Sequence, residues 1–185
     1  DGTSDNTIFK LLISPNGIST ISTQNIGFNT YTNSLNLYFN HNGNQLAIID
    51  VLGLLELYDF NRCTGMLSNL ITIHPENPSV PIQSFFWSAE FSPNDEILYV
   101  STENPSISFL YQYDLTASNI STSKLLIDTL VAPSIGGDLK LAADGRIYWS
   151  TGYSYNLYFP FPYADTIYNQ YNMNLNVINS PDNIG

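Results

Sequence analysis

The chain has 185 residues, of which 43% are hydrophobic, 14% aromatic and only 11% charged, and its formal net charge is -11. This length and hydrophobic content suffice for a buried core, and no apolar run reaches the roughly 18 to 20 residues that span a bilayer. The acidic balance disfavours nucleic acid, because a phosphate backbone would be repelled. We therefore expect neither a nucleic-acid partner nor insertion into a membrane.

Asparagine and tyrosine take the place of charged residues, with 22 Asn and 13 Tyr in the chain. Both residues suit turns and half-exposed strands better than helices, so the composition predicts an all-β chain. The single cysteine, Cys63, cannot form an internal disulfide, and His41 and His74 cannot complete a four-ligand zinc site with it. The Asp-x-Asp-x-Asp-Gly spacing of a calcium loop does not occur in the sequence. The sequence predicts no metal site and no cofactor.

The predicted elements begin with apolar segments at 8–13 and 18–21, which indicate two adjacent strands. A strand, a tight turn and a second strand then recur three times, at 37–48, 89–100 and 139–149. The turns contain Asn42-Gly43, Asn94-Asp95 and Asp144-Gly145, residues that tolerate positive φ or hydrogen-bond their own backbone. A third strand is predicted at 55–60, 110–115 and 175–178, and a fourth at 70–73 and 125–127.

A repeat of about 50 residues with four strands is typical of a propeller blade. We predict an all-β β-propeller of four-stranded antiparallel blades, with about three and a half blades here, as part of a larger, seven-bladed ring. The missing blades would come from residues outside this sequence or from another chain. The predicted units are the end of one blade at 1–28, blades at 29–73 and 84–130, and an incomplete blade at 136–185. The alternative is a two-sheet sandwich, whose strands recur every 8–12 residues.

The repeat also resembles known propellers. Phe91-Ser92-Pro93-Asn94-Asp95 with Leu98-Tyr99-Val100 is similar to the blade signature of lactonase-type and WD-repeat-like seven-bladed propellers. The segments 137–148 and 175–185, with Glu56-Leu57-Tyr58-Asp59-Phe60 and Cys63-Thr64-Gly65, resemble blades of large surface proteins of Bacteroidetes. Those proteins carry such a propeller upstream of a gliding-motility-associated or type IX secretion sorting domain. The resemblance spans about residues 35–185.

The resemblance implies an exported protein, secreted or at the exterior of the outer membrane, that acts in attachment or presentation rather than catalysis. Two positions depart from the family pattern. Ala143 stands where the family has proline, and Asp95 stands where it has glycine.

Few residues suggest chemistry, and we predict no catalytic residue. Glu90 precedes an inner-strand aromatic, so it could bind a cation or polarise a carbonyl at the channel. The simpler interpretation is a carboxylate that accepts hydrogen bonds from backbone amides of a neighbouring blade. Asp138 is its approximate equivalent and is expected at the start of a strand. His41 and His74 lack a neighbour suited to general-base catalysis, and no G-x-S-x-G elbow is present.

The long connections carry a stronger signal for binding. An insertion at 151–174 is rich in Tyr and Asn, which give rigid contact area and adaptable hydrogen bonds. A second long connection joins two blades at 74–87, and in a propeller both connections emerge on one face. The candidate binding residues are Trp87, Glu90, Tyr153, Tyr155, Phe159, Phe161 and Tyr163. The alternative is that these aromatics pack the insertion onto the blades.

Three functions are compatible with these patterns. The first is a noncatalytic surface module that binds a protein or a glycan in adhesion. The second is a lactonase-like hydrolase, which would need converging acids or histidines around an ion in the channel. The third is a structural spacer within a giant surface protein.

Overall fold

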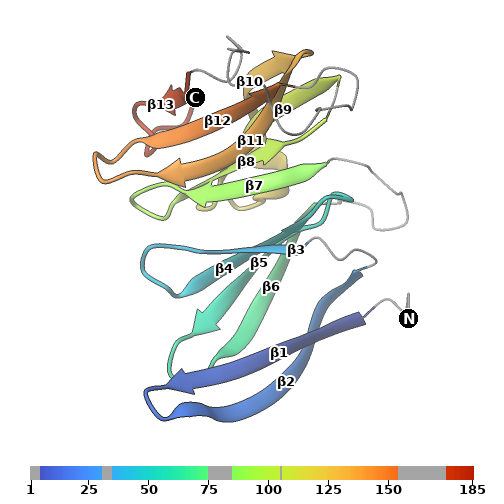
Figure 1. The fold of residues 1–185 in the computed structure, drawn as a ribbon, viewed down its shortest axis with the longest axis vertical. Coiled ribbons are helices and arrows are strands. Elements are labelled where there is room, and N and C mark those ends of the chain that lie inside the picture. The colour runs from blue at the N-terminus through green and yellow to red at the C-terminus, as the bar shows by residue number, and fades with distance from the viewer. Residues whose placement is uncertain (1–4, 31–34, 75–84, 105, 154–173) are drawn as a thin grey trace, which may run out of the picture.

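The computed structural model describes residues 5–30, 35–74, 85–104, 106–153 and 174–185. These residues form four antiparallel sheets whose strands follow chain order (Figure 1). The predicted all-β fold with four-stranded antiparallel blades is therefore confirmed, and we number the sheets as blades 1 to 4 along the chain. Within these residues, no helix has the length and apolar character to cross a membrane.

Blade 1 consists of β1 (Asp5–Ser14) and β2 (Gly17–Thr30). Blade 2 consists of β3 (Leu35–Phe39), β4 (Gln45–Asp50), β5 (Leu55–Asn61) and β6 (Met66–His74). Blade 3 consists of β7 (Phe86–Phe91), β8 (Ile97–Thr102), β9 (Ile107–Asp114) and β10 (Leu125–Val131), with a 3-10 turn at Ser121–Ser123 before β10. Blade 4 consists of β11 (Ser134–Leu141), β12 (Ile147–Tyr153) and β13 (Asn176–Ile178).

The first two strands of blades 2, 3 and 4 are joined by the tight turns that the repeat predicts. One position in each turn has a positive φ, namely 63° at Gly43, 62° at Asp95 and 77° at Gly145. The backbone N–H of each of these residues donates to the carbonyl three residues earlier. Glycine adopts this conformation without the steric penalty of a Cβ atom, whereas Asp95 must accept that penalty.

Alternate side chains on each strand face opposite neighbouring blades, as the pleat requires. On β7, Ala89 and Phe91 pack in the core shared with Leu57 and Ile73 of blade 2. Between blades 3 and 4, a second core contains Tyr99 and Trp149, among others. Between blades 1 and 2, a third core gathers Leu46, Ile48, Tyr58 and Leu67, with Ile8 and Ile26 packed against it. The hydrophobic core thus lies in layers between the sheets.

Blade 1 is tied to the outer strands of blade 2. The Gln24 amide donates to the Leu67 carbonyl at 2.6 Å, and the Leu67 N–H donates to Gln24 Oε1 at 3.1 Å. Further along β2, Gly27 lies against the Tyr58 hydroxyl, where any Cβ atom would overlap Tyr58 Oη. β2 therefore packs across β5 and β6. It extends to Thr30, well beyond the strand that its apolar residues at 18–21 predict, because β1 pairs with it over this whole length, up to Asp5 with Thr30.

The C-terminal segment closes over blade 3. β13 pairs with β12 as the predicted third strand, and among the described residues no fourth strand follows it. Residues 179–185 then cross to β8 and β9. There Gln112 donates to the Asn183 carbonyl at 2.7 Å and accepts from the Gly185 N–H at 3.0 Å, while the Tyr99 hydroxyl donates to the Pro181 carbonyl at 3.1 Å.

Candidate functional site

The strand pairings place the strand ends that flank both predicted long connections at one end of the blades. The first residue of each inner strand pairs near the last residue of the next strand, as in Leu35 with Asp50, Phe86 with Thr102 and Ser134 with Tyr153. Third strands begin at the same end, since Leu55 pairs with Ile49. The connections between blades and those between second and third strands therefore emerge together. We call this end the loop end, and the opposite end, with the tight turns, the turn end (Figure 1).

Trp87 lies at the loop end on β7 and is 39% exposed. Its backbone is held from blade 2, because its carbonyl accepts from the Asn36 amide at 3.0 Å and from the Tyr38 hydroxyl at 3.5 Å. A fixed backbone under an exposed ring gives contact area that loses little conformational freedom on binding. The binding role of Trp87 stays a prediction.

Tyr153 is the last residue of β12, is half-buried, and pairs with Ser134 at the loop end of blade 4. It therefore lies at the same end of the molecule as Trp87, one blade further along. The remaining aromatic candidates, Tyr155, Phe159, Phe161 and Tyr163, lie outside the described residues. Whether the insertion packs on the blades or presents its rings thus stays a prediction.

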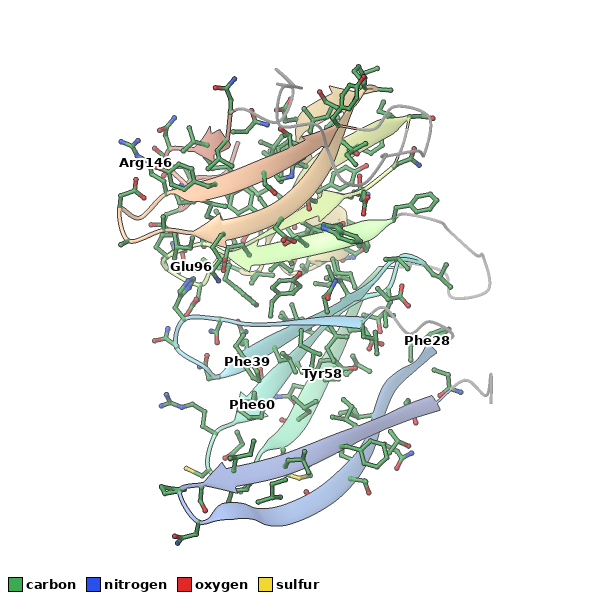
Figure 2. The ribbon with its side chains drawn as sticks, in the orientation of Figure 1. Phe28, Phe39, Tyr58, Phe60, Glu96 and Arg146 are labelled. Atoms are coloured by element: carbon green, nitrogen blue, oxygen red, sulfur yellow. The ribbon has the colours of Figure 1, made fainter. Side chains whose placement is uncertain are left out.

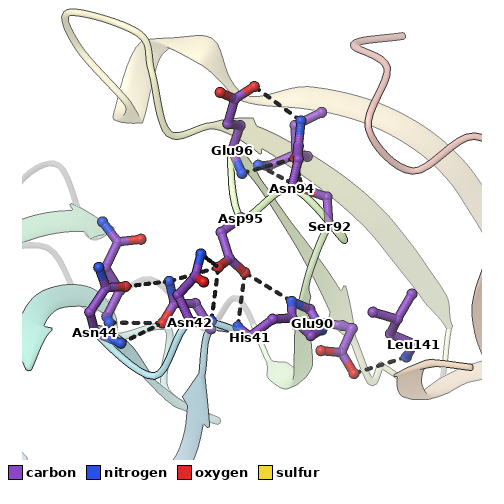
Figure 3. Close-up of polar contacts among 12 residues, drawn as sticks. His41, Asn42, Asn44, Glu90, Ser92, Asn94, Asp95, Glu96 and Leu141 are labelled. Atoms are coloured by element: carbon purple, nitrogen blue, oxygen red, sulfur yellow. Dashed lines mark hydrogen bonds and ion pairs between the residues drawn. The ribbon is translucent and has the colours of Figure 1, made fainter. Parts of the chain in front are cut away.

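Glu90 is 5% exposed on the innermost strand of blade 3. Its Oε2 atom accepts from the Leu141 N–H of blade 4 at 2.9 Å (Figure 3). The same atom lies 3.3 Å from the Lys140 ammonium. Two residues earlier, the Ser88 hydroxyl oxygen accepts from the Leu139 N–H at 3.0 Å. Glu90 thus accepts a hydrogen bond from the backbone of a neighbouring blade, as the simpler interpretation of the sequence predicts.

Asp138 is not at the start of a strand, and that expectation was wrong. β11 begins at Ser134, and Asp138 lies within it, exposed at the inner edge of blade 4. Sequence spacing alone misplaced it because β11 contains an irregularity between Gly136 and Leu139. Burial raises the pKa of Glu103, in the connection after β8, and the charge of Asp138 raises it further. The Asp138 carboxylate therefore lies close enough to Glu103 to disfavour its ionised form.

Tyr38 is a further polar side chain on this inner surface. Burial raises the pKa of Tyr38, and the charges of Asp138 and Glu90 raise it further. Hydrogen bonds with Ser88 and the Ala89 backbone lower this pKa, but they do not cancel the effect of burial. Within the described part of the chain, no three His, Cys, Asp or Glu side chains come close enough to hold a metal ion. The inner surface is thus an acidic, hydrogen-bonded surface whose described groups mainly join neighbouring blades.

At the turn end, one carboxylate joins blades 2 and 3. Asp95 accepts from the backbone N–H groups of His41 at 2.9 Å and Asn42 at 3.1 Å, and from the amides of Asn40 at 3.1 Å and Asn42 at 2.7 Å. His41 Nδ1 lies 2.8 Å from the same carboxylate (Figure 3). Burial alone would raise the pKa of Asp95, but the hydrogen bonds from His41 and Asn42 outweigh it and lower that pKa.

The sequence marks Asp95 as a turn residue that replaces glycine, and it gives His41 no neighbour suited to general-base catalysis. The structure corrects the second expectation, because the Asp95 carboxylate lies 2.8 Å from His41 Nδ1. The His41 side chain is 37% exposed and contacts Asp95 of the next blade. The signal was the replacement itself, because an acid at a position that prefers glycine needs a compensating contact.

No family model matches this sequence, and neither does any curated protein. Among solved structures the chain is similar to a luciferin-regenerating enzyme, with 14% sequence identity and a TM-score of 0.49. The alignment covers 71% of this chain and 40% of that one. The chain therefore spans less than half the length of that enzyme, and the fold described above rests on its own strand pairings.

Proposed function

We propose that this chain is a noncatalytic propeller module that binds a protein or a glycan through its loop end. The observation that carries the proposal is Trp87, an indole that stays 39% exposed on a strand whose backbone is fixed by Asn36 and Tyr38. Large aromatic side chains are enriched at the centres of binding surfaces, because they bury much area with few rotatable bonds.

Other apolar side chains at the loop end support the proposal. Beside Trp87, large apolar residues that are more than a third exposed at the loop end come from three blades. They are Phe28, Leu35, Leu52, Ile107 and Val131. Phe28 lies near the end of β2 (Figure 2). Exposed apolar residues that gather on one surface are characteristic of interaction sites, whereas single ones are ordinary.

The resemblance to large Bacteroidetes surface proteins supports a narrower proposal. In that setting the module is exported by type IX secretion and lies on the cell surface, where it acts in adhesion or gliding motility. Protease treatment of intact cells tests the location: cleavage of the protein without lysis supports it, and full protection contradicts it.

The binding proposal is tested with the double variant Trp87→Ser and Tyr153→Ser. Binding is measured on a glycan array and by surface plasmon resonance against purified outer-surface proteins of the source cells. The expected result is loss of binding with a melting temperature close to that of the unmodified chain. Met66→Ser is the matched control, because Met66 is 45% exposed at the turn end. Retained binding in the double variant, or an equal loss in the control, contradicts the proposal.

A further inference from the structure

The face of blade 2 that looks toward blade 1 is covered only in part. Ile8 and Ile26 of blade 1 pack on the core at Leu46, Ile48 and Tyr58. Beside this covered region, the innermost strand β3 carries Leu35, Leu37 and Phe39, which are 39%, 55% and 49% exposed. The rings of Phe39 and Phe60 pack edge to face, with 4.9 Å between their centroids, and both rings point toward blade 1 (Figure 2). The apolar surface of blade 2 therefore continues beyond the part that blade 1 covers.

The equivalent residues of blade 3 are covered completely. Ala89 and Phe91 occupy the positions of Leu37 and Phe39 in the repeat, and both are 0% exposed under blade 2. The difference follows from strand number: blade 2 has four strands, whereas the described part of blade 1 has two. Within the described residues, β1 pairs with β2 alone, so its other edge carries no strand.

The backbone of β3 also offers donors at this surface. The Asn40 N–H donates to the Gln45 carbonyl, so it faces β4. N–H groups of an antiparallel strand alternate between facing the partner and facing away. The Leu37 and Phe39 N–H groups therefore face away from β4, and the Tyr38 N–H between them faces β4.

At the junction of blades 3 and 4, the inner strand of the earlier blade accepts the equivalent hydrogen bonds. The Leu139 and Leu141 N–H groups, at the same repeat positions, donate to Ser88 and Glu90 of blade 3. Between blades 2 and 3, Tyr38 has a hydrogen bond with the Ala89 backbone. Between the same two blades, the Asn36 amide and the Tyr38 hydroxyl donate to the Trp87 carbonyl. At both junctions, polar side chains of one inner strand therefore hydrogen-bond with the backbone of the next, and at the junction of blades 3 and 4 these side chains accept.

From this continuity we propose that β3 and the open edge of β1 form a docking site for a β-hairpin of the same repeat type. The hairpin supplies the first two strands of blade 1. Its first strand carries two acceptor side chains, two residues apart, for the Leu37 and Phe39 N–H groups, and its apolar residues cover Leu37 and Phe39. The β7–β8 hairpin of this chain has that pattern, with Ser88 and Glu90 as the acceptors.

The test mixes the whole chain with a synthetic hairpin that has the sequence of residues 85–103. Amide hydrogen exchange of the whole chain is then measured with and without the hairpin. With the hairpin bound, exchange at Leu37 and Phe39 is expected to slow by at least about tenfold, the effect of one added hydrogen bond. Exchange at the Tyr38 amide is expected to stay unchanged, because that group already faces β4. A second form, with the hairpin joined ahead of residue 1 by a four-residue linker, repeats the measurement without free peptide.

Two controls separate docking from nonspecific adhesion. A hairpin with Ser88→Ala and Glu90→Ala is expected to lose the protection, and the whole-chain variant Leu37→Ser with Phe39→Ser is expected to bind the original hairpin at least about tenfold more weakly. Leu126→Ser, on exposed β10, is expected to bind as before. Absence of protection in both forms overturns the proposal, as does equal protection by the alanine hairpin. It is also overturned if sedimentation shows a dimer in which a second copy protects the same amides.

Discussion

Replacing Asp95 with glycine is expected to destabilise the chain, although glycine is the residue that the backbone of this turn prefers. The φ of 62° disfavours aspartate, and its removal would recover about 1 kcal/mol of backbone strain. Against this stands the loss of an acceptor for two backbone N–H groups, two amides and the His41 ring. Hydrogen bonds to a charged group contribute about 1.5–3 kcal/mol each, but bonds that share one partner are not additive.

We therefore expect Asp95→Gly to lower the free energy of unfolding by about 1–3 kcal/mol after the recovered strain. Asp95→Ala is expected to lose more, because alanine keeps the strain and removes the acceptor. Asp95→Asn is expected to lose least, since asparagine tolerates positive φ and retains one acceptor oxygen.

The pH dependence gives an independent check. Because hydrogen bonds from His41 and Asn42 lower the pKa of Asp95 below its ordinary 3.8, the folded state holds the carboxylate more strongly than the unfolded state does. This stabilisation is fully present above the unfolded pKa and is lost as the pH falls through the folded pKa. The stability difference between the natural chain and Asp95→Asn is therefore expected to be largest near neutral pH and to shrink below about pH 3.8.

Urea unfolding followed by tryptophan fluorescence measures these differences. Asp144→Asn is the control, because Asp144 lies in the corresponding turn of blade 4 and its hydrogen bonds stay within that hairpin. It is expected to change stability little. If Asp95→Gly is as stable as the natural chain, strain outweighs the contact and the reasoning fails.

Three further changes test other junctions. Gly27→Ala is expected to lower the melting temperature much more than Gly17→Ala. Both glycines have positive φ, but only a Cβ atom at Gly27 would meet Tyr58 and lie 2.7 Å from Glu56 Oε2. Similar losses in the two variants would contradict this packing. Glu90→Ala is expected to lose about 1–3 kcal/mol of stability in urea unfolding, and Glu90→Gln less, since glutamine keeps an acceptor for the Leu141 N–H; equal losses would argue against that bond. Gln112→Leu is expected to speed amide exchange at Gly185, whose N–H donates to Gln112, and unchanged exchange would show that the C-terminal segment is held otherwise.

The sequence predicts the repeat well because its signals are local. The turns at Gly43, Asp95 and Gly145 recur at one position, and alternating apolar residues between them define strands whose partners follow directly in the chain. Antiparallel pairing of consecutive strands needs only a short turn, so order and pairing can be predicted without long-range information.

The sequence can predict the type of contact between blades, but not which residues make it. Glu90 could be predicted as an acceptor for a neighbouring blade, because a carboxylate on an inner strand has few other partners. The partner of Asp95 could not be predicted, since it depends on how closely the turns of blades 2 and 3 approach. The length of β2 was missed because its polar residues carry little strand signal of their own. Gln24 lies in the strand because it pairs with Ile8 of β1, and its side chain then holds the Leu67 backbone.

The junctions between inner strands have a consequence for how such repeats diverge. At Leu139 and Leu141 the donor is a backbone N–H group, which every residue except proline possesses, and the acceptor is a side chain of the preceding blade. Substitutions in the later blade therefore leave these hydrogen bonds intact, while the earlier blade must keep a Ser, a Glu or another acceptor. Selection on each junction thus acts mainly on one of the two repeats that form it. Neighbouring copies can lose sequence identity rapidly and still stack in the same order.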